Sequence, residues 1–283
     1  MANSYLNIVT FLLTTLFYYL AIKPSFTYEI SVDPTKNKEY ISKNYMYLAI
    51  YLLLVMIIQF IVNASIISST CGGNITENMG AAGVFTFLPW TLIFGVLIVI
   101  LSIYPGFKSA FSDVVGYYWV SSSASKLLTD LLIDQNIQNK IDASTTSTPE
   151  QKQAMQNAAD AIIKIVGNTA VLINQIVPSN FESYWNILKP LMKPQFQTDS
   201  AETMDMKNKL FELVVTKDNV GESMWYMYTG LLLTSIVQLK ITSRGCVNNP
   251  KTMEQNYQKF LAAEQQSKSQ QDLSTNTTYT ITN

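Results

Sequence analysis

The stretch VFTFLPWTLIFGVLIVILSIY, residues 84–104, contains no Asp, Glu, Lys or Arg. As an α-helix rising about 1.5 Å per residue, it would extend about 31 Å, which matches a bilayer hydrocarbon core of about 30 Å. Residues 4–22 and 45–67 are equally free of charge and would extend about 28 and 34 Å. Each of these three stretches is therefore expected to cross a membrane once.

Residues 223–241 form a fourth apolar stretch, which includes Thr229, Thr234 and Gln238. This stretch either crosses the membrane or lies in its interface. The sequence thus predicts a mainly α-helical protein with three or four transmembrane helices and a helical extramembrane domain. The expected regions are a three-span transmembrane region at 1–104, a helical extramembrane domain at 105–220, a fourth transmembrane helix at 221–242 and a polar, partly disordered tail at 243–283.

Composition argues against several functional classes. A net charge of −1 and a pI near 5.6 provide no basic face for nucleic acid. The chain has no histidine and only two cysteines, which removes the commonest metal ligand and catalytic base and leaves no closed zinc site. We therefore expect a protein that is not an enzyme, with no catalytic residues, cofactor, metal or small-molecule substrate.

Charge around the predicted spans gives their orientation. Residues 23–44 carry Lys23, Lys36, Lys38 and Lys43, whereas residues 68–83 carry only Glu77, so the positive-inside rule places the first connection in the cytosol. Two further connections then lie on the opposite, lumenal side: the short one at 68–83 and the one after the fourth span. They contain Cys71 and Cys246, which leads us to expect a disulfide between these residues.

The extramembrane region 105–220 is expected to supply contacts with other proteins. Apolar residues at helical spacing predict a helix over 107–132, with a break at the serines 121–123, and an amphipathic helix over 149–177. Aromatic residues beside proline-broken turns are typical of binding anchors. The partner-binding residues assigned on this basis are Phe107, Trp119, Tyr184 and Trp185.

Three Asn-x-Ser/Thr sequences begin at Asn63, Asn74 and Asn276. The first two fall in or beside predicted spans, so Asn276 is the one candidate glycosylation site that a modifying enzyme could reach. Acidic residues such as Asp113 are interpreted as ordinary charge on a solvated helix face. Asn7, Gln59 and Gln238 are expected to form hydrogen bonds between transmembrane helices.

Several short segments carry a resemblance: YYLAIKP at 18–24, CGGN at 71–74, LPW at 88–90, YPGF at 104–107, GYYW at 116–119, TG at 229–230 and GC at 245–246. In these segments the chain resembles multi-pass membrane proteins of nucleocytoplasmic large DNA viruses, including viruses of algae and protists. The resemblance covers most of the first 120 residues and 222–250. None of these segments is a catalytic motif, and residues 121–220 are particular to this chain.

The resemblance implies a structural role as a minor capsid protein or virion inner-membrane protein. Its partners would be the lipid bilayer and the major and other minor capsid proteins. Its location would be the virion internal membrane beneath the capsid, and host endomembrane during assembly. Residues 105–220 would then face the shell. Two other classes remain open: a channel or transporter subunit, and a virion membrane protein that acts in penetration of the host cell.

Overall fold

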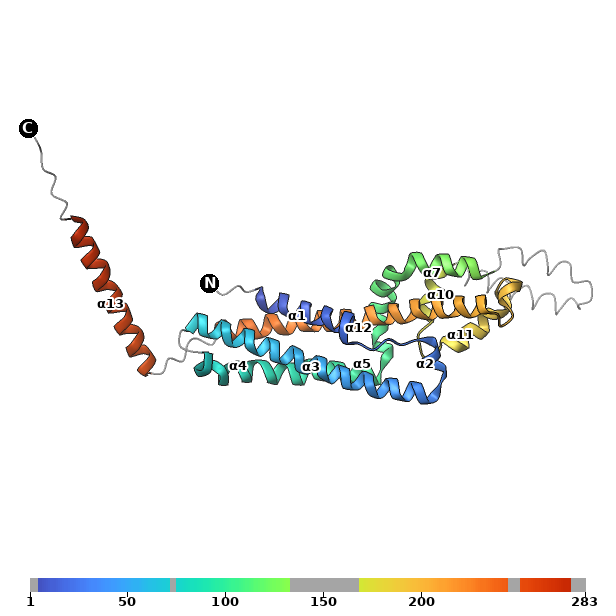
Figure 1. Ribbon diagram of the computed structural model, residues 1–283, viewed down its shortest axis with the longest axis horizontal. Helices are drawn as coiled ribbons and strands as arrows, with labels where there is room; N and C mark the ends of the chain where they lie inside the picture. The colour runs from blue at the N-terminus through green and yellow to red at the C-terminus, as the bar shows by residue number, and fades with distance from the viewer. Residues whose placement is uncertain (1–4, 72–74, 133–167, 244–249, 276–283) are drawn as a thin grey trace, which may run out of the picture.

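The computed structural model describes residues 5–71, 75–132, 168–243 and 250–275 (Figure 1). These residues are mainly helical, as expected, and contain no β-strand; one isolated bridge joins Leu132 to Met192. Four of the sequence-based assignments involve residues outside the described ranges. They are Cys246, Asn276, residues 149–167 of the expected amphipathic helix, and residues 244–249 and 276–283 of the expected tail.

A bundle of four antiparallel rods forms one half of the molecule (Figure 1). The first rod is α1 (Leu6–Phe17) with the π-helix η1 (Tyr18–Ile22), and the second is α3 (Pro34–Cys71). The third rod joins α4 (Ile75–Pro89), the π-helix η2 (Trp90–Gly95) and α5 (Val96–Ile103), and the fourth is the second half of α12 (Ala201–Ser243). Aromatic rings including Phe11, Tyr51, Trp90, Phe94 and Tyr226 pack in its core.

The first half of α12 continues into a helical domain with α7 (Tyr117–Leu131), α10 (Thr169–Gln175) and α11 (Phe181–Leu188). Its core contains Leu128, Leu172, Phe181, Trp185 and Phe211. The short helix α2 (Tyr28–Val32) packs beside it through Tyr28. Short 3₁₀ turns η5 (Lys189–Leu191) and η6 (Pro194–Phe196) precede α12, and α13 (Pro250–Thr275) extends away from the bundle in Figure 1.

Local sequence explains where the long helices begin. The Asp33 carboxylate accepts hydrogen bonds from the amides of Thr35 and Lys36, at 2.9 and 3.1 Å, and caps α3. Ser200 Oγ accepts one from the amide of Thr203 at 3.1 Å and caps α12. Because α3 begins at Pro34, much of the connection at 23–44 is helical.

The largely apolar core of the bundle encloses a small group of hydrogen-bonded polar side chains. Asn7 Nδ2 donates to Asn63 Oδ1 at 2.9 Å, Asn63 Nδ2 donates to Thr86 Oγ1 at 2.8 Å, and Gln59 Nε2 donates to the carbonyl of Asn7 at 3.1 Å. All four of these side chains are buried. The hydrogen bonds expected between helices at Asn7 and Gln59 are thus confirmed, and they join three of the four rods.

Large apolar side chains cover the outer face of all four rods, and we call this surface the apolar collar. Its members are exposed residues on α1, α3, the third rod and the second half of α12: Leu13, Leu16, Leu20, Ile50, Leu53, Ile57, Ile61, Leu88, Leu92, Val96, Val99, Ile103, Tyr228, Leu232, Ile236 and Leu239. A soluble bundle would place polar residues on this face.

Among the residues that the structure describes, two helical segments, Pro34–Cys71 and Asn78–Ile103, are long and apolar enough to cross a membrane by length and composition, which favours a membrane association. Their most apolar windows are 44% and 28% buried, whereas the core helix of a soluble protein would be mostly enclosed. The segment Leu6–Ile22 is also apolar but shorter.

The region after residue 104 differs from its expected form. The run begins with the 3₁₀ turn η3 (Pro105–Lys108), α6 (Ser109–Phe111) and the π-helix η4 (Ser112–Gly116), and α7 then passes through the serines 121–123 without a break. Helical propensity of serine is only moderately low, and burial of Val120, Ala124 and Leu128 on one face holds the helix together.

Candidate functional site

One face of α12 carries charged residues among its buried apolar residues. Lys207, Lys217 and Glu222 follow the same helical spacing as Leu210 and Val214, and all five side chains are buried. Buried charges are retained in folded proteins when they are paired. Each of the three charges binds a different part of the chain, so α12 connects the helical domain to the bundle.

Glu222 lies at the centre of an ion-pair network, where the bundle meets the helical domain. Its carboxylate accepts hydrogen bonds from Lys108 Nζ at 2.6 Å, from the Tyr19 hydroxyl at 3.0 Å and from Lys23 Nζ. Lys108 also binds Asp218 at 3.0 Å, one turn before Glu222 on α12. Three segments distant in sequence, the end of η1, η3 and α12, therefore meet at one carboxylate.

The two lysines of this network experience different electrostatic environments. Burial alone would lower the pKa of Lys108, but the negative charges of Glu222 and Asp218 outweigh it and raise that pKa above its ordinary value. For Lys23, burial is the largest effect and lowers the pKa, because attraction to Glu222 offsets it only in part and Lys108 adds repulsion.

Lys217 joins α12 to two other segments of the helical domain. Its ammonium group donates to Asp113 of η4 at 3.1 Å and to the carbonyl of Asn174 of α10 at 3.3 Å, and its side chain has 0% exposure. The interpretation of Asp113 as an ordinary surface charge is therefore wrong. Asp113 is the counter-ion of a fully buried lysine.

Lys207 makes a similar contact nearer the start of α12. It binds the carboxylate of Glu182 on α11 at 2.9 Å and lies 4.5 Å from the centre of the Tyr28 ring. The Tyr28 hydroxyl donates to the same carboxylate at 2.8 Å. This group connects α2, α11 and α12.

Close backbone approach brings η4 against α12. A Cβ atom on Gly116 would lie 2.4 Å from the carbonyl oxygen of Lys217, and one on Gly221 would lie 2.5 Å from Ser112 Cβ. The two glycines thus lie on opposite sides of one crossing. This contact holds Asp113 beside Lys217.

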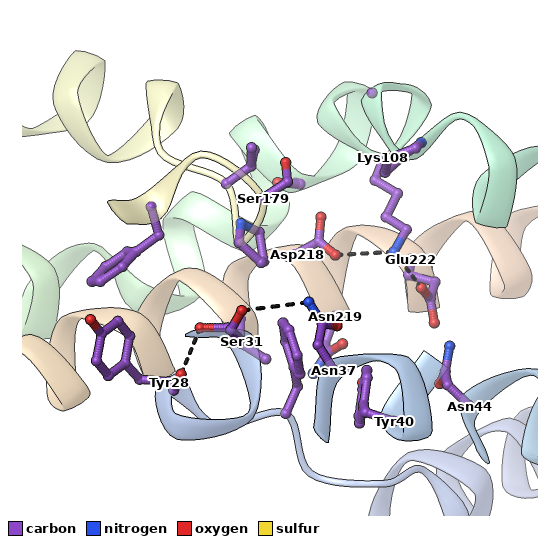
Figure 2. A pocket seen from close by; sticks show the side chains of 18 of the residues that line it. Tyr28, Ser31, Asn37, Tyr40, Asn44, Lys108, Ser179, Asp218, Asn219 and Glu222 are labelled. Carbon is purple, nitrogen blue, oxygen red and sulfur yellow. Dashed lines mark hydrogen bonds and ion pairs between the residues drawn. The ribbon is translucent and has the colours of Figure 1, made fainter. Parts of the chain in front are cut away.

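A cavity of about 710 Å³ lies beside the Glu222 network (Figure 2). Figure 2 shows Lys108 extending to Asp218 and Glu222 on one side of it, and Tyr28, Ser31, Asn37 and Tyr40 of α2 and α3 on the other. The side-chain oxygens of Asn44 and Asn174, two lining residues, are buried without a hydrogen-bond partner among the described residues. Apolar residues such as Phe26, Val32 and Val215 complete the walls.

The site is a junction of buried ion pairs. The carboxylate of Glu222 is bound by two ammonium groups and a hydroxyl. Among the residues that the structure describes, no group of three or more His, Cys, Asp or Glu could hold a metal ion.

The structure places the four assigned partner-binding residues in different environments. Trp185 is 3% exposed and belongs to the core of the helical domain, and Tyr184 is partly buried against that core. The assignment of Trp185 as a docking anchor is therefore wrong, because the apolar face of α11 packs inward. Phe107 and Trp119 are exposed, and lie on the run that leads from η3 into α7.

Sequence analysis missed Lys23, Lys108, Lys217 and Glu222. The pairs Lys23–Glu222 and Lys217–Asp113 are separated by 199 and 104 positions, and no local pattern joins them. One signal was present: Lys207, Lys217 and Glu222 share the face of Leu210, Phe211 and Val214. A charge on an apolar helix face indicates a buried pair, although it does not identify the partner.

Comparison of the chain with protein-family models, curated proteins and solved structures finds no match.

Proposed function

We propose that this protein is a four-span integral membrane protein with a structural role, which anchors an internal virion membrane to a capsid shell through its helical domain. The observation that carries the membrane part is the apolar exterior of the bundle, combined with polar side chains that are hydrogen-bonded inside it. Asn7, Asn63, Gln59 and Thr86 form hydrogen bonds in the interior, whereas the apolar collar faces outward. Lipid acyl chains favour this arrangement and water opposes it.

Four spans are supported by the packing of α1 and α12 in the same bundle as the two longer apolar segments. Phe11 of α1 packs so closely on Gly230 of α12 that a Cβ on this glycine would lie 2.0 Å from the ring. The collar includes residues of α12 from Tyr228 to Leu239. If two of the rods cross a bilayer, the other two are enclosed with them.

The anchoring role is supported by the rigid link between the two halves. The single helix α12 runs through both, and ion pairs at Lys207, Lys217 and Glu222 join it to four other segments. The bundle and the helical domain are thus joined by one continuous helix and by buried ion pairs. The capsid shell as partner rests on the resemblance to virion inner-membrane proteins. A channel or transporter subunit, and a protein for host-cell penetration, are the alternatives.

The membrane proposal predicts different results for two similar substitutions: Ile57→Lys should reduce membrane insertion, and Ile187→Lys should be tolerated. Ile57→Lys places a charge in the collar near the middle of a proposed span, where it is expected to cost about 2.5–3.5 kcal/mol and reduce the carbonate-resistant membrane fraction. Ile187→Lys is the matched control, because Ile187 on α11 is more exposed, at 63% against 44%, but lies in the helical domain. Equal tolerance of both variants would contradict the proposal.

The capsid contact is tested by crosslinking on purified particles. Amine-reactive crosslinkers and mass spectrometry should connect the exposed Lys126 and Lys209 of the helical domain to capsid proteins. The variant Lys126→Arg keeps the charge and should lose its own crosslink only.

Labelling of these lysines on intact particles from outside would favour the penetration role instead. Conductance of the purified protein in planar bilayers would favour the channel.

The disulfide between Cys71 and Cys246 stays a prediction. Cys71 ends α3, where it packs in one cluster with Val237 and Ile241 of α12. Cys246 follows Ile241 by five positions, so the described ends of the two helices are close enough together to make the pairing reasonable. A bridge there would hold α12 to α3 at the lumenal end of the bundle.

A further inference from the structure

The helical run from residue 105 to 119 has large apolar side chains outside and small residues inside. Phe107, Val114, Tyr118 and Trp119 are 56%, 68%, 81% and 72% exposed. Ser112, on the opposite face, is buried, and Gly116 lies against the backbone of α12. Water disfavours such an arrangement, so this face has a partner other than water.

The outward face changes character a few residues later. Beyond Trp119 the exposed residues of α7 are polar: Ser122, Ser123, Lys126, Thr129 and Asp130. The same helical run is therefore apolar outside before residue 120 and polar outside after it. Such a change along one helix is expected where the run leaves a lipid environment for water.

Contacts with α12 fix the run beside the collar. Trp225 Nε1 donates to the carbonyl of Phe107 at 2.9 Å, and the Phe111 ring lies 5.0 Å from the Trp225 ring and 6.2 Å from the ring of Tyr228. Tyr228 is a collar residue, and α5 ends in the collar at Ile103. In Figure 1 the run passes across α12 between the bundle and the helical domain. Its aromatic face is thus continuous with the collar.

We propose that residues 105–119 form an in-plane interfacial segment whose exposed face lies in the headgroup layer of the bilayer. The proposal rests on the membrane function above. Tyr and Trp side chains favour this layer because one part of the ring is apolar and another forms hydrogen bonds. Phe107 and Trp119 accordingly bind lipid, and they are not anchors for a protein partner. The segment fixes the height of the helical domain above the membrane.

Tryptophan fluorescence of the full chain in phosphatidylcholine vesicles with brominated acyl chains tests this proposal. The chain has four tryptophans, so the comparison is between Trp119→Phe and Trp185→Phe. Trp119→Phe should remove emission that bromine quenches. Trp185→Phe should remove emission that bromine does not quench, because Trp185 is buried in the helical domain. Emission of Trp90 and Trp225 is common to both variants.

A third variant, Leu92→Trp, places a tryptophan in the collar. It distinguishes failure of the interfacial-segment proposal from failure of the membrane proposal. If bromine quenches the added tryptophan but leaves Trp119 accessible to acrylamide alone, the interfacial segment is wrong and its aromatic face serves a protein partner. If bromine quenches neither, the collar does not contact lipid and the membrane function itself fails. Quenching of both by bromine is the result we expect.

Discussion

Replacing Glu222 with glutamine is expected to lower the free energy of unfolding by about 3–5 kcal/mol, since it leaves buried charges without their counter-ion. Glu222 binds Lys23, Lys108 and the Tyr19 hydroxyl, and a neutral amide cannot compensate two ammonium groups. Chemical unfolding in detergent micelles at pH 7 measures the change. At pH 7 Lys108 is fully charged, because this pH lies well below its raised pKa. Its contribution to stability is complete below the ordinary lysine pKa and is lost only as the pH rises through the raised pKa.

Two further variants show whether the cost arises from unpaired charge. Glu212→Gln makes the same chemical change at an exposed position of the same helix, and we expect an effect within about 0.5 kcal/mol. Lys23→Met added to Glu222→Gln removes one unpaired ammonium group and should recover part of the loss, whereas Lys108 retains Asp218. A loss as small as that of Glu212→Gln would mean that the network does not stabilise the junction.

The rods of the bundle could be predicted because their signal is local. Residues 45–67 and 84–104 are apolar over about 20 positions, and such length and composition decide a helix without knowledge of its neighbours. The cap of α12 at Ser200 was predictable for the same reason, because its hydrogen bond spans three residues. Element boundaries were less accurate. The structure extends α3 back to Pro34 and makes the fourth apolar stretch the second half of a 43-residue helix.

The junction could not be predicted, because its pairs form only when the fold brings distant segments together. Lys23 and Glu222 each resemble an ordinary charge beside an apolar stretch, and nothing within ten residues of either identifies the other. The burial of aromatic residues could not be predicted from local sequence either. Trp185 and Trp119 are similar by local composition, yet one fills the core of the helical domain and the other is exposed. Tertiary packing decided between them.

Replacing Gly116 with alanine is expected to lower the free energy of unfolding by about 3 kcal/mol or more, at the upper end of the range for overpacking. Gly116 has ordinary helical angles, φ −61° and ψ −45°, so backbone strain is not the cause. The added methyl group would lie 2.4 Å from the carbonyl oxygen of Lys217, and backbone cannot rotate away as a side chain can. Separation of η4 from α12 would also weaken the Asp113–Lys217 pair.

The matched control is Gly80→Ala in α4, where an added Cβ would have no atom within 4 Å. The same change is expected there to stabilise the protein by about 0.8–1 kcal/mol, because alanine favours helix over glycine. Gly221→Ala presses on Ser112 across the same crossing, so the double variant with Gly116→Ala should cost less than the sum of the two. Once the first methyl group separates the helices, the second adds little further steric clash and so little further loss of stability. Additive costs would show that the two glycines act independently, and a stabilising Gly116→Ala would show that η4 and α12 are not in close contact.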